Sequence, residues 1–411
     1  MNTQVAWTIM VYMAGDNNLS AAGDRDLVEM RRVGSTDDVN VIVEFDNAGN
    51  HGTRRIHVKK NGVAETVEHL GETDSGSPEV LVNFIKWAAE NYPARRYALV
   101  LWNHGGGWAP TEVDRIARSV NSRAYNEREI AERSSSALGR AFFRSTLQKV
   151  FELESPSERA ICSDDGSGHS LDTLELHRVI AQGVGMIGQP FDLLGMDACL
   201  MSNLEVAYQL REHVRYIVAS EELEPANGWP YERILARFVG DPGMATADIA
   251  AHIVQDYVDS YVELEYVGDV TQTAVDLSRL MELTAPLDVL AKYLIPNMKD
   301  AYPAIWKAQR TSTRFFHNTL WDIGHFCEEL VQHSDDENVR AAAAAVVEAH
   351  AVGQGRALIA EAHNGVKVQH CRGTSAYLIP PFMNISSYYE ELAFARNFRW
   401  LDMLRAYHDA I

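Results

Sequence analysis

The sequence predicts an α/β fold with a mostly parallel central sheet between helices, followed by a largely helical C-terminal region. Apolar runs of strand length alternate with segments of helical periodicity over about the first 240 residues, a pattern typical of a parallel sheet covered on both faces. Beyond residue 240, amphipathic helical runs dominate. We therefore expect an α/β core at residues 1–240 and a mainly helical region at 241–411, which contributes strands near 271–277 and 374–380 to the same unit.

The elements of the core can be assigned in chain order. The apolar run Val5–Met13 predicts a first strand, because turn-forming residues close it. Asn61-Gly62 predicts a hairpin turn, and Pro78 suits the first turn of a helix. The other elements expected here are a helix at Ala21–Val33, strands at Val39–Phe45, Arg54–Lys59, Val63–His69, Tyr97–Trp102, Ala160–Ser163, Phe191–Gly195 and Tyr216–Ser220, and helices at Asp172–Ala181 and from about Cys199. The amphipathic runs beyond the core are Ala247–Leu264, Leu280–Tyr293, Trp321–His333 and Asn338–Ala351.

Charge and cysteine content exclude several function classes. The formal charge of −20 disfavours nucleic-acid or anionic-membrane binding and is compatible with cationic substrates. Four cysteines in 411 residues, with no CxxC pair, predict neither a disulfide scaffold nor a zinc site. The N-terminal apolar run lacks a basic flank and is too short for a bilayer. We expect a cytoplasmic protein with no required cofactor.

Cys199 lies where an apolar strand is expected to pass into a helix. Backbone N–H groups and the positive end of a helix dipole would stabilise a thiolate there. A free cysteine is more commonly a small buried apolar residue, so this position alone does not identify a nucleophile.

His104 supplies the base that a cysteine nucleophile needs. It follows the strand Tyr97–Trp102, as Cys199 follows the strand from Phe191, and polar sites form at the carboxyl ends of such strands. If the two strands are neighbours, a Cys–His pair results. The glycines after His104, beginning with Gly105, allow backbone N–H groups to approach a substrate carbonyl as an oxyanion hole requires. HGGG-type loops also occur in esterases, but no serine lies in the GxSxG motif which that class requires.

Residues 111–158 differ in composition from the rest of the core. This segment carries seven arginines: Arg115, Arg118, Arg123, Arg128, Arg133, Arg140 and Arg144. We interpret it as an insert with either a regulatory role or the role of a solvated helical connection.

Together these motifs resemble the clostripain family of cysteine peptidases, of the caspase, legumain and gingipain clan. The matching stretches are WTIMVYMAGDNNL, YALVLWNHGGGW, SDDGSGHSLDTLEL, FDLLGMDACLMSNLEVAYQL, VASEELEPANGWPY, WDIGHFCEEL and GTSAYLIP. The resemblance implies a caspase-like α/β/α sandwich and peptide-bond hydrolysis, with His104 and Cys199 as the catalytic pair. The caspase signature QAC[RQG]G is absent.

The resemblance also implies cleavage after Arg or Lys through acidic groups in the specificity pocket. Asp197 matches the acid two residues before the nucleophile, and it could also serve as a helix N-cap. Glu224 and Asn227 stand where relatives can carry a second acid. Relatives are commonly matured by self-cleavage between the His and Cys motifs, and some bind Ca²⁺. Asp164 and Asp165 offer oxygen ligands, but no calcium-loop spacing is present.

We therefore predict a cysteine endopeptidase that acts on protein or peptide substrates with basic residues and is regulated by self-cleavage in the insert. Two alternatives remain open: a catalytically silent caspase-like scaffold, and a hydrolase or acyltransferase acting on a non-peptide acyl group. The sequence does not predict the oligomeric state.

Overall fold

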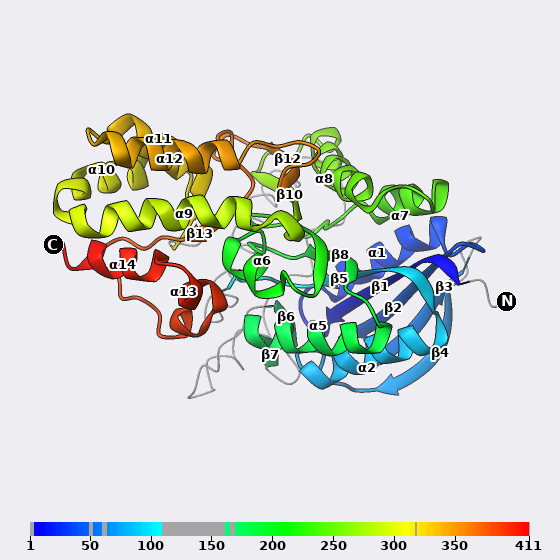
Figure 1. The fold of residues 1–411 in the computed structure, drawn as a ribbon. Helices are drawn as coiled ribbons and strands as arrows, with labels where there is room; N and C mark the ends of the chain where they lie inside the picture. The colour runs from blue at the N-terminus through cyan, green and yellow to red at the C-terminus, as the bar shows by residue number, and fades with distance from the viewer. Residues whose placement is uncertain are drawn as a thin grey trace. The chain divides into compact units, whose positions relative to one another are not determined.

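The computed structural model describes residues 4–48, 52–59, 64–108, 161–164, 169–316 and 319–410. The chain divides into a first unit, Met1–Cys199 with Leu223–Ala245, and a second unit, Leu200–Glu222 with Thr246–Ile411 (Figure 1). Residues 200–222 were expected in the core of residues 1–240 and group with the C-terminal part. The arginine-rich insert, 111–158, lies outside the described residues.

The strands of the first unit lie in the order β8-β5-β1-β2-β3-β4. Strands β8, β5, β1 and β2 are parallel to one another, whereas the hairpin β3–β4 adds antiparallel strands at one edge. The bounds are β1 Val5–Gly15, β2 Val39–Asn47, β3 Thr53–Val58, β4 Ala64–Gly71, β5 Ala94–Trp102 and β8 Phe191–Asp197. A separate antiparallel pair consists of β6 Ile161–Asp164 and β7 His169–Leu171.

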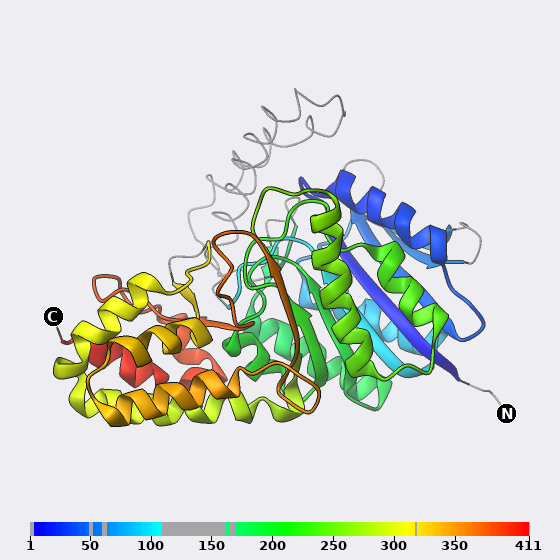
Figure 2. The same cartoon turned by 90° about the horizontal axis from the view of Figure 1, so that it is seen from above.

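Helices cover both faces of these strands. Helix α1 (Ser20–Val33) packs with α7 (Tyr231–Gly240), and α2 (Pro78–Asn91) packs with α5 (Thr173–Ile187) on the opposite face (Figures 1 and 2). Every residue of β1 after Val5 is buried, as expected for a strand with helices on both sides. The first unit is therefore an α/β/α sandwich.

Local sequence signals set the helix ends in this unit. Asp172 and Glu175 form a capping box that begins α5, and Gly188 ends the helix in the left-handed conformation, with φ of 76°. Pro78 occupies the first turn of α2, as predicted.

The second unit combines three antiparallel strands with a helical bundle. Strands β12 (Leu358–Asn364), β10 (Val270–Asp276) and β9 (Val214–Ala219) lie in that order, and α8 (Thr246–Glu263) packs on them. Strands β11 (Leu320–Asp322) and β13 (Ser375–Tyr377) form a separate pair. The other helices are α6 Leu204–Leu210, α9 Met281–Leu294, α10 Met298–Thr311, α11 Ile323–His333, α12 Glu337–Ala349, α13 Ala393–Asn397 and α14 Trp400–His408, with 3₁₀ turns at Leu277–Arg279, Ile295–Asn297 and Tyr388–Glu391. None of the helices among the described residues combines the length and apolar character that crossing a bilayer requires.

One predicted helix start is wrong. We expected a helix from about Cys199, but α6 begins at Leu204. The backbone N–H groups of Leu200 and Ser202 bind the carbonyls of Glu222 and Ser220, and Leu200 has a φ of 63°, so this stretch cannot be helical. Asn203 then caps α6 by accepting from the Val206 N–H.

Candidate active site

The two motif-bearing strands of the first unit are adjacent. Strands β5 and β8 pair in parallel, with Trp102 opposite Asp197, and the Asn103 N–H donates to the Asp197 carbonyl at 3.3 Å. His104 lies two residues after Trp102, and Cys199 lies two residues after Asp197. Both residues are therefore at the same edge of the sheet and in register with each other. The condition for a Cys–His pair, that its strands be neighbours, is therefore met.

His104 and Cys199 line one cavity. Both residues are 4% exposed. The cavity has a volume of ≈ 30 Å³, and its lining residues are Leu19, Trp102, Asn103, His104, Asp197, Cys199, Glu224, Pro225, Ala226 and Gly228. Such a volume holds about one water molecule, so a substrate side chain can enter only if the lining moves.

His104 is held by the turn that follows β1. Its Nε2 lies 2.7 Å from Asn18 Oδ1. Since the amide oxygen is an acceptor, Nε2 carries the proton and the lone pair lies on Nδ1. The His104 backbone N–H donates to Asn103 Oδ1 at 2.5 Å, and the same oxygen accepts from Asn17 Nδ2 at 3.0 Å. Burial lowers the pKa of His104 to about 4, so the imidazole is neutral at pH 7.

The sulfur of Cys199 contacts the backbone of Glu224. The Glu224 N–H donates to Sγ at 3.2 Å, and Sγ lies 3.8 Å from the Glu224 carbonyl oxygen. A donor aimed at sulfur favours the thiolate. The dipole of α6 does not supply this stabilisation as we had expected, because that helix begins five residues further along the chain.

Gly105 allows the backbone after His104 to approach Cys199 closely. A Cβ at this position would lie 3.0 Å from Ala198 Cβ and from the Cys199 nitrogen, and nearer still to the Cys199 carbonyl oxygen. Only a residue without a side chain fits there unless the backbone moves. The Gly105 backbone thus lies directly against the backbone of Cys199, and its role as an oxyanion donor stays a prediction.

Two buried carboxyl groups lie beside the pair. Asp197 Oδ2 accepts from the Tyr231 hydroxyl at 2.9 Å and from the Trp229 N–H at 3.3 Å. Burial raises the pKa of Asp197 to about 6, while hydrogen bonds from Glu224 and Tyr231 oppose that rise. Because a hydrogen bond between two carboxyl groups requires a proton, Asp197 and Glu224 share one.

Gly228 brings the following loop onto this carboxyl pair. A Cβ at Gly228 would lie 3.1 Å from Asp197 Oδ2, and its φ of 59° is one that glycine adopts without strain. Asn227, the other predicted substrate-binding residue, is exposed and does not line the cavity. Its role stays a prediction.

Three further residues support the site and were not predicted from the sequence. Asn18 holds His104, Tyr231 holds Asp197, and Asp26 in α1 accepts from the Trp102 indole N–H at 2.7 Å. Burial first, and then the Asp197 charge, raise the pKa of Asp26 well above its usual value. A sequence signal exists only for Asn18: it lies in the turn that closes the first predicted strand, at the same edge of the sheet.

The calcium ligands considered from sequence cannot be placed. Asp165 and the Asp164 side chain lie outside what the structure describes.

Comparison with known proteins assigns the family. The model of the clostripain family matches residues 11–131 and 149–407. Clostripain from Hathewaya histolytica is 27% identical over 273 residues, which cover 59% of this chain; the chain thus spans less than half, 44%, of that relative.

Two solved structures share the fold. A secreted C11 cysteine protease from Bacteroides thetaiotaomicron, in complex with an irreversible peptide inhibitor, has a TM-score of 0.64 at 19% identity and covers 98% of this chain and 99% of its own. An inactive zymogen C11 protease from Parabacteroides distasonis has a TM-score of 0.65 at 20% identity, over 97% and 99% of the two chains. Since the family model covers most of the sequence, this chain belongs to the clostripain family of cysteine peptidases.

Proposed function

We propose that this protein is a cysteine endopeptidase that cleaves after Arg or Lys, with Cys199 as nucleophile and His104 as general base and acid. One observation carries the proposal. His104 and Cys199 follow adjacent parallel strands in register and line a single cavity together with the buried acids Asp197 and Glu224. Membership of the clostripain family supports the same reaction.

The geometry suggests how each group acts. His104 Nδ1, which has the lone pair, takes the proton from the Cys199 thiol as Sγ attacks the substrate carbonyl carbon. The Gly105 N–H donates to the oxyanion that forms. His104 then gives the proton to the departing amine, leaving a thioester on Cys199. Water activated by His104 hydrolyses this thioester and restores the thiol.

The acids explain the preference for a basic side chain. A guanidinium or ammonium group that reaches Asp197 and Glu224 displaces the proton they share and pairs with the carboxylates. The cavity, at ≈ 30 Å³, is too small for an arginine side chain, so we propose that the loop at residues 224–228 moves outward when substrate binds.

Fluorogenic peptides that differ only in the residue before the scissile bond test this proposal. Wild type should turn over the Arg and Lys peptides much faster than the Leu or Asp peptides, and Cys199→Ala and His104→Ala should be inactive. Cys327→Ala is the matched control, because Cys327 is buried in the second unit and does not line the cavity. A preference for Leu or Asp would reject the pocket assignment, whereas activity retained by Cys199→Ala would reject the nucleophile.

Two further proposals concern regulation and location. We propose that self-cleavage at an arginine of the 111–158 insert controls activity, on the basis of its composition and the inferred specificity. We also retain the cytoplasmic location as a proposal, supported by the free thiols of Cys199, Cys327 and Cys371. The relative from Bacteroides thetaiotaomicron is described as secreted, so cell fractionation is the relevant measurement.

A further inference from the structure

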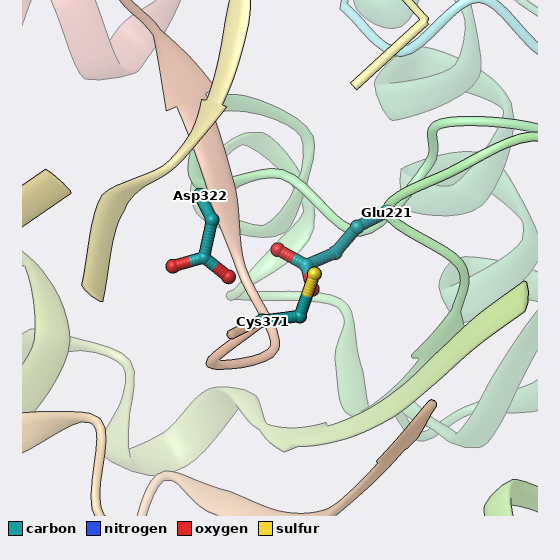
Figure 3. Close-up of side chains that lie close together, drawn as sticks. All are labelled: Glu221, Asp322 and Cys371. Atoms are coloured by element: carbon teal, nitrogen blue, oxygen red, sulfur yellow. The ribbon is translucent and has the colours of Figure 1, made fainter. Parts of the chain in front are cut away.

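Three side chains from distant parts of the sequence meet in the interior of the second unit. Glu221 follows β9, Asp322 ends β11, and Cys371 precedes β13. One potential ligand atom from each lies within 4.8 Å of the other two. All three residues are buried, at 0%, 0% and 1% exposure. Figure 3 shows the Cys371 sulfur beside the Glu221 carboxylate, with the Asp322 carboxylate facing it.

The Glu221 carboxylate is the unusual member of this cluster. Neither of its oxygens has a hydrogen-bond partner among the described residues. Burial raises the pKa of the Glu221 carboxyl well above its usual value, the neighbouring Asp322 carboxyl raises it further, and the Gly373 backbone opposes the rise. Burying an unpaired carboxylate is costly, and buried charges are normally paired or bound to metal. Either a proton shared with Asp322 or a bound cation would offset this cost at Glu221.

Asp322, by contrast, is already oriented. Its Oδ1 accepts from the His325 N–H at 2.7 Å, and its Oδ2 accepts from the Arg372 N–H at 2.5 Å. Each carboxylate oxygen has a second lone pair, so these bonds leave Asp322 able to bind a cation. Backbone donors of this kind fix the direction of a metal ligand.

The surroundings add negative charge. The Glu361 carboxylate acts on Glu221, Asp322 and Cys371 alike, and its Oε1 lies 2.7 Å from His363 Nδ1. The guanidinium of Arg372, whose backbone N–H binds Asp322, pairs with Glu328 at 2.6 Å. Among the residues that the structure describes, acidic groups therefore predominate around the cluster.

We propose that Glu221, Asp322 and Cys371 form a binding site for one divalent transition-metal ion of the zinc class. Carboxylate oxygen and cysteine sulfur together suit Zn²⁺, whereas Ca²⁺ and Mg²⁺ take oxygen ligands only. A tetrahedral zinc site has ligand atoms about 3.5 Å apart, so separations of up to 4.8 Å require only a small inward movement. Water fills the fourth position. On binding, the Cys371 thiol and the Glu221–Asp322 carboxyl pair release their protons to solvent, and a net charge of −1 remains on the ion and its three ligands.

A competing arrangement needs no metal. Two buried carboxyl groups that face each other can share one proton, which also relieves the repulsion between Glu221 and Asp322. In that arrangement Cys371 plays no part beyond packing. The role of the thiol therefore separates the two possibilities.

The experiment uses full-length protein carrying Cys199→Ala, which removes the active-site thiol as a competing ligand and makes the result independent of the proposed peptidase activity. Into this background Cys371→Ser, Glu221→Gln and Cys327→Ser are introduced separately. Cys327→Ser is the matched control, since Cys327 is an equally buried free thiol outside the cluster. Each protein is incubated with Zn²⁺, desalted, and analysed for metal content by mass spectrometry and for Tm with and without a chelator.

We expect about one zinc per chain in the background protein and in Cys327→Ser, and less than a tenth of that in Cys371→Ser and Glu221→Gln. The chelator should lower Tm only in the proteins that retain zinc. With Co²⁺, a near-ultraviolet thiolate-to-metal band should be present in the Cys327→Ser protein and absent from Cys371→Ser. A folded background protein that retains no zinc would overturn the proposal, as would equal zinc content in Cys371→Ser. If Cys371→Ser fails to fold, unchanged zinc content in Glu221→Gln would overturn the proposal in its place.

Discussion

Substrate choice is expected to depend most strongly on the Asp197 side chain. Its carboxylate is buried, held by Tyr231 and Trp229, and lines the same cavity as Cys199. Asp197→Asn should reduce kcat/KM for the Arg peptide, because a buried charge pair is lost. The loss of transition-state stabilisation should be roughly 2–5 kcal/mol. The Leu peptide should change far less. The ratio of kcat/KM between the two peptides is the quantity to measure.

Asp192→Asn is the control for this substitution. Asp192 is a buried acid on the same strand, near its opposite end, where its Oδ2 accepts from the Tyr97 N–H at 3.0 Å. The Asp192→Asn substitution should leave the ratio of kcat/KM between the Arg and Leu peptides unchanged, even if the stability of the protein falls. A ratio that Asp197→Asn left unaltered would show that this carboxylate does not contact the basic side chain.

The raised pKa of Asp197 predicts how pH affects both binding and stability. Below about pH 6 the folded protein keeps this group protonated, so KM for the Arg peptide should fall as pH rises from 5 to 7. The unfolded chain loses the proton at lower pH, because its carboxyl has an ordinary pKa. This group therefore favours folding at low pH, and its contribution declines as pH rises to about 6. Asp197→Asn should flatten the dependence of both KM and stability on pH. If the variant kept the pH dependence of wild type, another group would be responsible for it.

Gly105 should tolerate no side chain. In Gly105→Ala the added Cβ would meet Ala198 Cβ and the Cys199 backbone, so the segment after His104 must shift. We expect kcat to fall roughly 100-fold, the size of effect seen when one oxyanion donor is misplaced. Gly185→Ala is the control: a Cβ at Gly185, within α5, meets no atom within 4 Å, and alanine in a helix adds about 0.5–1 kcal/mol of stability. Near-normal kcat in Gly105→Ala would remove this residue from the mechanism.

Among the elements, the turn after β1 positions the base. Asn18 Oδ1 accepts a hydrogen bond from His104 Nε2 at 2.7 Å and thereby favours the tautomer with the proton on Nε2. Asn18→Ala should lower kcat roughly tenfold or more with little change in KM, because ring orientation is lost and substrate contacts are not. Asn40→Ala is the comparison, since Asn40 bonds Thr8 at the opposite end of the strands. If KM rose and kcat stayed constant, Asn18 would contact substrate instead.

Helices and strands were predicted from the sequence where residues close together in the chain determine them, and were missed where long-range contacts do. The strands carrying His104 and Cys199 were predicted because each is a continuous apolar run, and β5 and β8 are indeed neighbours. The start of α6 was missed because long-range backbone bonds from Leu200 and Ser202 override helical periodicity. Helix α10, with Pro303 in its interior, and the half-exposed strand β12 carry weak patterns and were not predicted.

Over the whole molecule, sites made from distant residues are the least predictable. The family motifs marked His104, Cys199 and Asp197, because those residues lie within the recognisable stretches. Glu221 and Asp322 also lie within such stretches, but nothing in their spacing connects them to Cys371. The sequence therefore predicted no metal, whereas folding of the second unit brings these three donors together.

The insert at residues 111–158 provides the final prediction, which concerns the state of the whole chain. Its seven arginines match the inferred specificity, and it lies between the His104 and Cys199 motifs in sequence. A cut there would leave β5 and β8 paired, because these strands bond each other directly. Purified wild type, incubated alone, should therefore yield two fragments that stay associated under native conditions and separate in denaturant.

Cys199→Ala, incubated in parallel, should remain a single chain, since it lacks the proposed nucleophile. N-terminal sequencing of the C-terminal wild-type fragment should locate the cut after one of the seven arginines of the insert. A variant with all seven arginines and Lys149 replaced by glutamine keeps the length of the insert and should stay uncut. If that uncut variant has full activity on the Arg peptide from the first minute, cleavage is not what activates the enzyme. If it is inactive until an added protease cuts the insert, the covalent continuity of residues 111–158 is what restrains the Cys199–His104 pair.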